Sequence, residues 1–117
     1  MASYRREKLE ELIRRVVAES LLKEVKDPRI GFVTVTRVSL SKDYGTADVY
    51  VSVIGDESEK KLTMAGINSA RSFIQHIVGS EVRLRIMPRI VFHLDTSIEE
   101  GVNLVGLIDS ANPRGDE

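Results

Sequence analysis

The sequence predicts an α+β fold in which helices cover one face of a three-stranded sheet and leave the other face to solvent. Two amphipathic stretches with helical spacing, at 5–21 and 62–77, supply the helices. Two strands joined by a tight turn must be antiparallel, whereas a third strand that follows a helical crossover can lie parallel to one of them. The expected result is a two-layer sandwich with element order α-β-β-α-α-β and a short C-terminal helix.

Composition is ordinary for one globular domain. The 117 residues are 42% hydrophobic and 30% charged, and we expect a single domain over 1–110 with a flexible tail at 111–117. No cysteine is present, which excludes disulfides and thiolate metal sites. No apolar run approaches the ~18 residues of a membrane span, and the N-terminus lacks a signal-like segment. We therefore expect a cytoplasmic protein.

The net charge of −1 conceals an uneven distribution along the chain. Residues 1–42 hold ten basic and six acidic side chains, and 68–94 hold four and one. By contrast, 43–67 hold two and five, and 95–117 hold one and six. The protein can therefore present a basic face to nucleic acid while remaining nearly neutral. A solvated surface without a binding role explains the same charges equally well.

The first helix is predicted by an apolar stripe of helical period: Leu9, Leu12, Ile13, Val16, Val17 and Leu21. It should end before Pro28, because proline biases the preceding residue out of the α region. The basic side chains Arg5, Arg6 and Lys8 lie mostly off this stripe and are available to a partner.

Two strands are predicted next. The first, at 32–38, is rich in β-branched residues, and its apolar side chains change face between Val35 and Val38, as in a central or a bulged strand. Asp43-Tyr44-Gly45 has the composition of a hairpin turn. Beyond the turn, four apolar residues alternate strictly with polar ones and predict a strand with one buried face: Ala47, Val49, Val51 and Val53.

The stretch 62–78 is predicted to be a bent helix. Small and apolar side chains share one helical stripe: Leu62, Ala65, Gly66, Ser69, Ala70, Phe73, Ile74 and Ile77. We expect Phe73 and Ile77 to share the core with the first helix and the second strand. Gly79 is a natural helix end. Three short side chains in mid-helix permit a kink: Ser69, Ala70 and Ser72.

A basic strand is predicted to follow from Arg83 onward, where the period changes to two. Its apolar face would carry Leu84, Ile86, Ile90, Phe92 and Leu94. Its other face would carry Arg83, Arg85, Arg89 and His93, which favours contact with a phosphate backbone. Further on, Ser97-Ile98-Glu99-Glu100 has the form of a capping box, and a short helical stripe follows it: Ile98, Val102, Val105 and Ile108.

Catalytic and metal-binding motifs are absent from the sequence. The two histidines, His76 and His93, fall on different predicted elements, and no cysteine supports a zinc site. There is no P-loop, no dinucleotide fingerprint and no nucleophile elbow. We therefore expect a protein that is not an enzyme and that uses no metal, cofactor or small-molecule substrate. Tyr44 and Tyr50 could stack on bases, although a tyrosine on an alternating strand is equally a surface β-former.

Four segments, in this order along the chain, carry a resemblance to a known family: Val25-Lys26-Asp27-Pro28-Arg29-Ile30-Gly31, Ala47-Asp48-Val49-Tyr50-Val51-Ser52-Val53, Leu84-Arg85-Ile86-Met87-Pro88 and Asp95-Thr96-Ser97-Ile98-Glu99-Glu100-Gly101. Together they closely resemble the bacterial ribosome-binding factor A family from about Arg5 to Ile108. The resemblance implies a KH-like fold of type II topology. It also implies binding to the small (30S) ribosomal subunit and 16S rRNA, a role in late subunit maturation and rRNA processing, and a link to growth in the cold.

Two positions depart from the family pattern. The family usually carries Ala-x-Gly at the helix kink, where this chain has Ala70-Arg71-Ser72, and it often carries an arginine where this chain has Gln75. Arg71 can restore the missing charge from the previous turn. No GxxG occurs in the chain, which argues against gripping single-stranded RNA by such a loop.

Two functions remain open from the sequence. A monomeric RNA-binding protein would place eight basic residues on phosphates: Arg5, Arg6, Lys8, Arg29, Arg71, Arg83, Arg85 and Arg89. A regulatory or protein-interaction domain that does not bind RNA would leave the same residues solvated. Steep salt dependence of binding separates the two, since phosphate contacts release condensed counterions.

Overall fold

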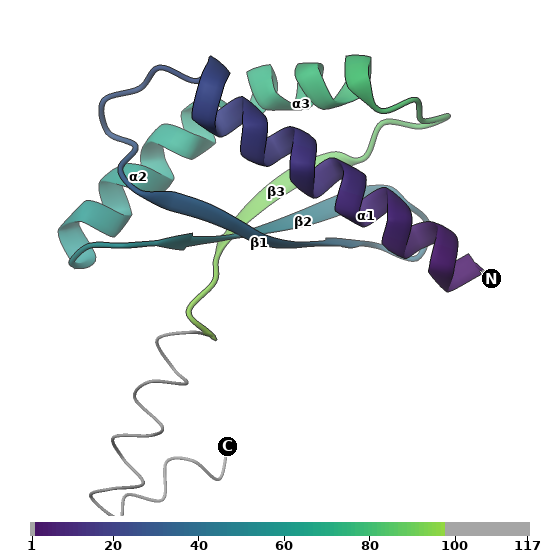
Figure 1. Cartoon of the computed structure of the whole chain (residues 1–117), viewed down its shortest axis with the longest axis horizontal. Coiled ribbons are helices and arrows are strands. Elements are labelled where there is room, and N and C mark those ends of the chain that lie inside the picture. Colours follow the sequence, from purple (N-terminus) through teal and green to yellow (C-terminus); the bar gives the residue numbers. More distant parts are fainter. Residues whose placement is uncertain (1, 98–117) are drawn as a thin grey trace, which may run out of the picture.

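The computed structural model describes residues 2–97, so the predicted C-terminal helix and the tail at 111–117 lie outside the described residues. The helices form one layer and the sheet forms the other, with the helices on one face of the sheet (Figure 1). This arrangement confirms the predicted α+β sandwich. The elements in order are α1 (Ala2–Glu19), a π-helical turn η1 (Ser20–Glu24), β1 (Val33–Leu40), β2 (Thr46–Val53), α2 (Glu57–Ser69), α3 (Arg71–Glu81) and β3 (Arg89–Leu94).

The sheet has the order β1-β2-β3. β1 and β2 pair antiparallel, and β3 returns parallel to β2, as the crossover predicts. Of the two explanations for the change of apolar face in β1, the bulge is correct, since β1 lies at the edge of the sheet and its register shifts between Val35 and Arg37. Tyr44 closes the hairpin with a φ of 62°, and the Asp43 carboxylate accepts the N–H of Gly45 at 2.9 Å. Such side-chain acceptors favour the turn.

The core lies between the sheet and the helices. Val49 and Val51 of β2 have no exposed surface, and the polar residues between them face the open side of the sheet. The helices contribute fully buried side chains to the same cluster: Ile13, Val17, Ile67, Ile74 and Val78. α2 begins with a complete capping box, in which Asp56 accepts the N–H of Glu59 and Glu59 accepts the N–H of Asp56.

The helical bend is confirmed, and the predicted stripe is right at Gly66 and Ile74 but wrong at Leu62 and Phe73, which are exposed. α2 ends at Ser69 and α3 begins at Arg71, with Ala70 between them at φ −90° and ψ 3°. Phe73 is 47% exposed, whereas its neighbour Ile74 is fully buried. The buried face includes Thr63, whose hydroxyl donates to Arg29 O and accepts from Gly31 N–H. Because Thr63 is polar and has its hydrogen bonds within the protein, its place on the buried face cannot be recognised from hydrophobic spacing.

The predicted basic strand is also wrong in its first half. Residues 83–88 form a loop, and β3 begins only at Arg89. β3 pairs with β2, and the pair of Arg89 is Thr46, the first residue of β2. Residues before Arg89 therefore have no strand to pair with. Pro88 is buried, Ile86 is 65% exposed, and Arg83, Arg85 and Arg89 do not share one strand face.

Gly79 does not end a helix, contrary to the sequence-based expectation. α3 continues to Glu81, and the N–H of Val82 still donates to the carbonyl of Val78 at 2.8 Å. A Cβ at Gly79 would lie 3.5 Å from Met87 Sδ, which is ordinary van der Waals contact. Gly79 thus lies where the loop of residues 82–88 returns past α3.

Candidate nucleic-acid interface

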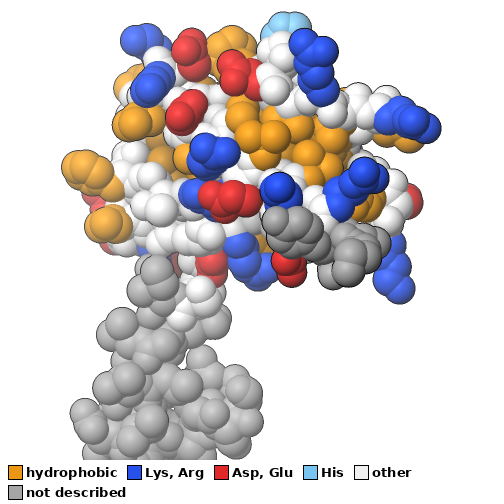
Figure 2. Space-filling view, turned by 45° about the vertical axis from the view of Figure 1, so that its right-hand side comes forward, with side chains coloured by type: hydrophobic (Ala, Val, Ile, Leu, Met, Phe, Trp, Pro, Cys, Tyr) orange, Lys and Arg blue, Asp and Glu red, His pale blue; other side chains and the backbone are white. Residues whose placement is uncertain are grey.

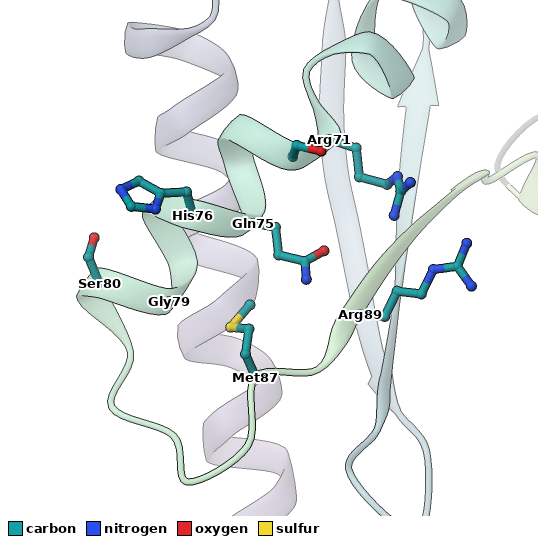
Figure 3. Close-up of a pocket in the computed structure, with 8 residues that line it drawn as sticks. Arg71, Gln75, His76, Gly79, Ser80, Met87 and Arg89 are labelled. Atoms are coloured by element: carbon teal, nitrogen blue, oxygen red, sulfur yellow. The ribbon is translucent and has the colours of Figure 1, made fainter.

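A hollow of about 800 Å³ opens between α3 and the chain that leads into β3. Its lining holds two arginines and no carboxylate: Arg71, Ser72, Gln75, His76, Gly79, Ser80, Met87 and Arg89. Arg71 and Arg89 extend from α3 and β3 in the same direction at one end, and His76 and Ser80 lie at the other (Figure 3). Two guanidinium groups and several neutral donors suit phosphate oxygens, because arginine offers bidentate donors.

The open edge of β3 is held by α3 within this hollow. Gln75 Oε1 accepts the N–H of Ile90 at 3.2 Å. Arg71 Nη1 donates to the carbonyl of Ile90, with a nitrogen-to-oxygen distance of 3.5 Å. Gln75 therefore has a structural role at the edge of β3, and Arg71 is the one cation that α3 contributes to the lining of the hollow. Composition gave no signal for this role of Gln75.

The other predicted arginines of this region lie beside the hollow. Arg83 and Arg85 are exposed on the loop of residues 82–88, between the buried Val82 and Pro88. They do not line the hollow. The structure therefore brings together only Arg71 and Arg89 from the four arginines predicted between residues 71 and 89. Lys and Arg side chains border a hydrophobic area on the face shown in Figure 2.

Arg29 is engaged within the protein. Its Nε and Nη2 donate to the two Asp27 oxygens at 3.0 and 2.7 Å, and Nη2 also donates to Ser69 Oγ at 3.1 Å. These hydrogen bonds hold the pKa of Asp27 at about 2 and raise that of Arg29. The side chain remains 42% exposed. Arg29 thus connects the loop before β1 to the end of α2, next to the break at Ala70.

The predicted basic residues of the first helix lie on the first turns of α1. Arg5 and Lys8 are exposed. Arg6 is partly buried, with its guanidinium carbon 5.6 Å from the centroid of the Tyr44 ring. This distance is typical of a cation–π contact. Tyr44 belongs to the hairpin turn, and the next residue, Gly45, accepts the N–H of Arg89 at 2.9 Å. The turn therefore joins α1 to the start of β3.

Sequence reasoning missed a row of contacting side chains across the open face of the sheet. Arg37 Cζ lies 3.7 Å from the Tyr50 ring centroid, and the His93 ring stacks on Tyr50 at 4.9 Å. His93 Nε2 lies 2.8 Å from Asp48 Oδ1. Because Arg37 and His93 approach Tyr50 from the two neighbouring strands, its ring is occupied by protein contacts. Cross-strand register, which alternation alone does not give, brings these residues together.

Residues 2–97 hold neither a cluster of metal ligands nor a membrane-spanning helix. No group of three or more His, Asp or Glu side chains there converges to hold a metal ion. None of the described helices combines the length and apolar character needed to cross a membrane.

Comparison with known proteins gives a consistent family. The family model described as ribosome-binding factor A matches residues 5–108. A ribosome-binding factor A from Carboxydothermus hydrogenoformans is 41% identical over 117 residues, which cover 100% of this chain and 94% of that protein. The crystal structure of ribosome-binding factor A from Thermus thermophilus aligns with a TM-score of 0.66 at 30% identity, covering 76% of this chain and 94% of the other.

A further structural relative comes from a complex with the 30S ribosomal subunit. Coordinates of a homology model of the Thermus thermophilus factor, fitted into a cryo-EM map of a complex of the 30S subunit with ribosome-binding factor A, align with a TM-score of 0.64 at 28% identity. They cover 78% of this chain and 96% of the other. With the family match spanning residues 5–108 and the fold shared with these relatives, this chain belongs to the ribosome-binding factor A family.

Proposed function

We propose that this protein binds the small ribosomal subunit through 16S rRNA and places the hollow between α3 and β3 against the phosphate backbone. The observation that carries the proposal is the convergence of Arg71 and Arg89 on a lining without carboxylates. The relative fitted into a map of a 30S complex supports the choice of partner. Arg83 and Arg85, exposed on the adjoining loop, would extend the contact.

Binding by this surface would position the protein rather than identify a base sequence, because phosphate contacts carry no sequence information directly. A monomeric, cytoplasmic factor of this kind would act on free small subunits during late maturation. Assistance to 16S rRNA processing and to growth in the cold follows from the family resemblance. No catalytic step is part of the proposal.

Co-sedimentation with free small subunits tests the proposal. The protein should sediment with free subunits and not with assembled ribosomes. Each phosphate contact on single-stranded RNA contributes a slope of about −0.7 in a plot of log affinity against log salt. Two contacts should therefore weaken binding roughly sevenfold for a fourfold rise in salt by that relation. Binding that hardly changes with salt would instead favour a protein-interaction domain.

A matched variant pair distinguishes the hollow from general surface charge. Arg89→Ala removes an exposed cation of the hollow, whereas Arg14→Ala removes a cation of α1 that pairs with Glu11 at 2.6 Å. Only the first should weaken binding and flatten the salt dependence. Equal effects would mean that the hollow is not the RNA surface, and Arg5 with Lys8 on α1 would become the better candidate.

A further inference from the structure

A groove of about 500 Å³ lies between the end of α1, η1 and the first half of β1. Its lining is mainly apolar and includes Leu22, Val25 and Phe32. Leu22 and Phe32 are each 80% exposed, and no segment in the part of the chain that the structure describes covers them. Ile54, whose N–H donates to the carbonyl of Phe32 at 3.1 Å, is 75% exposed. Large hydrophobic side chains gathered beside a groove indicate a surface that binds a partner.

The backbone of β1 offers hydrogen bonds along the same groove. β1 is an edge strand and pairs with β2 on one side only. Because the N–H of Ile54 donates to the carbonyl of Phe32, the ladder alternates so that the N–H and C=O groups of Val33 and Val35 point away from β2. Among residues 5–97 none forms a hydrogen bond with these outward groups. Proline and lysine often protect edge strands from pairing, and Val33-Thr34-Val35 contains neither.

A second hollow continues the groove along the other half of β1. It is lined by residues of α1 and by residues 36–38 of β1, which directly follow the β1 residues of the groove. Arg14 lines both, so the two form one path along the outer edge of the strand. Farther along, the outward N–H of Leu40 donates to Glu10 Oε2 at 2.8 Å. The path beside Val33–Val38 is about 17 Å long, at about 3.3 Å per residue, which suits a short extended peptide.

The second hollow is acidic. Its charged side chains are Glu7, Glu10, Glu11, Arg14 and Arg37. Arg14 pairs with Glu11 at 2.6 Å, and the guanidinium of Arg37 lies over the Tyr50 ring on the open face of the sheet. Glu7 and Glu10 are therefore left without a cationic partner among the described side chains. Two such carboxylates repel phosphate and attract basic side chains, so the charge at this edge favours a basic polypeptide over RNA.

We propose that the outer edge of β1 binds an extended segment of another protein, which joins the sheet as an antiparallel fourth strand. Apolar side chains of the segment cover Leu22 and Phe32, and basic side chains at its N-terminal end meet Glu7 and Glu10. The antiparallel direction follows because such ladders are the slightly more stable kind. It places the N-terminal end of the segment at the acidic end of β1. Main-chain hydrogen bonds supply affinity in this mode of binding, and the side chains supply selectivity.

A synthetic peptide tests the proposal on the full chain. The probe is an acetylated and amidated peptide with two lysines at its N-terminal end, followed by alternating valine and threonine. At saturation it should slow hydrogen exchange at the amides of Val33 and Val35, whose N–H groups would then donate to the peptide. The matched control peptide has glutamates in place of the lysines. It should bind about threefold or more weakly, as expected for two lost charge pairs at a surface.

Two variants locate the bound peptide. Val33→Pro removes one outward N–H at the first residue of β1, a position where a strand accepts proline. It should abolish the protection that the peptide gives to Val35. Glu7→Gln with Glu10→Gln removes the two charges and keeps an acceptor for the N–H of Leu40. This double variant should bind the two peptides equally, and it keeps the test decisive if the proline variant does not fold.

The control variant is Glu57→Gln with Glu81→Gln, which makes the same change of charge on α2 and α3 and should leave the preference for the lysine peptide intact. Equal binding of the two peptides by the wild type, or unchanged exchange at the two outward amides, would overturn the proposal. Slow exchange at these amides without peptide would overturn it too. Protection that rises with protein concentration would then assign the edge to a second copy, and constant protection would assign it to another segment of this chain.

Discussion

Arg29 and Ser69, forty residues apart in the chain, are joined by a hydrogen bond of 3.1 Å from Nη2 to Oγ. Ser69 is the last residue of α2, immediately before the break at Ala70. The contact therefore ties the loop before β1 to the point where the helical segment bends. It also gives a physical role to the segment Lys26-Asp27-Pro28-Arg29-Ile30-Gly31, which packs against α2 through Gly66 and Thr63.

Gly66→Ala should destabilise the protein although alanine favours helices. A Cβ at this position would lie 2.8 Å from Ile30 Cγ1 and 3.3 Å from Asp27 Cγ, so the loop would have to move. We expect a loss of about 1–3 kcal/mol in the free energy of unfolding, the range for overpacking. The control is Gly79→Ala, whose Cβ meets only Met87 Sδ at 3.5 Å. That change should stabilise by up to about 1 kcal/mol, and chemical denaturation measures both.

Phe73→Ala should cost much less stability than Ile74→Ala. Phe73 is 47% exposed, whereas Ile74 is fully buried among the core residues of α3. Removing the buried isoleucine side chain should cost about 2–5 kcal/mol through lost burial and a cavity. The phenylalanine change should cost about 1 kcal/mol, near the surface range. Urea unfolding of the two variants decides the helical register, and a reversed order would restore the face on which Phe73 is buried.

Acid should weaken the loop contact at Asp27. Its pKa is lowered from 3.8 to about 2, first by the side-chain hydrogen bonds of Arg29 and then by the backbone N–H of Arg29. A lowered folded-state pKa means that the stabilisation is present above about pH 4 and is lost as the pH falls toward 2. Asp27→Asn should therefore be less stable than the wild type at pH 7 and should lose less stability between pH 4 and 2. Parallel stability curves for the two proteins would contradict this assignment.

The arginines that line the hollow should contribute more to subunit binding than the arginines on the loop of residues 82–88. In the double variant Arg71→Ala with Arg89→Ala, the magnitude of the salt slope should fall by about 1.4, which corresponds to two lost phosphate contacts. Arg83→Ala with Arg85→Ala removes the same charge from the loop at residues 82–88 and should have a smaller effect. Quantitative co-sedimentation over a salt series measures both, and a larger effect from the loop pair would move the interface onto the loop.

Alternation and turn chemistry predicted much of the sheet. The alternating valines of β2 are buried as expected, because alternate side chains of a strand lie on the one face that the helices cover. The bulge in β1 was visible as a change of apolar face between Val35 and Val38. Such signals are local, so a single sequence carries them.

The errors arose where local pattern competes with distant contacts. Residues 83–88 alternate like a strand, but β2 begins at Thr46 and offers them no partner. Phe73 and Ile74 both fit the predicted apolar spacing, although only Ile74 is buried. The buried Thr63 does not fit that spacing, because its hydrogen-bond partners Arg29 and Gly31 are distant in the sequence. Strand pairing and hydrogen bonds between residues more than 30 positions apart in the sequence decide where β3 begins and which face of α2 is buried.

The candidate site was predictable only in part. Charge and spacing alone predict Arg71 and Arg89 as binding residues, and the two line one hollow. The same criterion predicts Arg29, but its guanidinium donates hydrogen bonds to Asp27 and Ser69 within the protein. Charge and spacing identify basic residues. Which of them already form hydrogen bonds or ion pairs within the protein depends on the tertiary structure.

The two α3 contacts to Ile90 also bear on self-association. An unprotected edge strand offers its backbone groups to the sheet of another molecule, which is a route to aggregation. Gln75 and Arg71 occupy the outward N–H and carbonyl of Ile90, so this part of β3 cannot act as a template for an incoming strand. Gln75→Leu should therefore raise the tendency to form β-rich aggregates on prolonged incubation, a cost that a binding assay on fresh protein would not reveal.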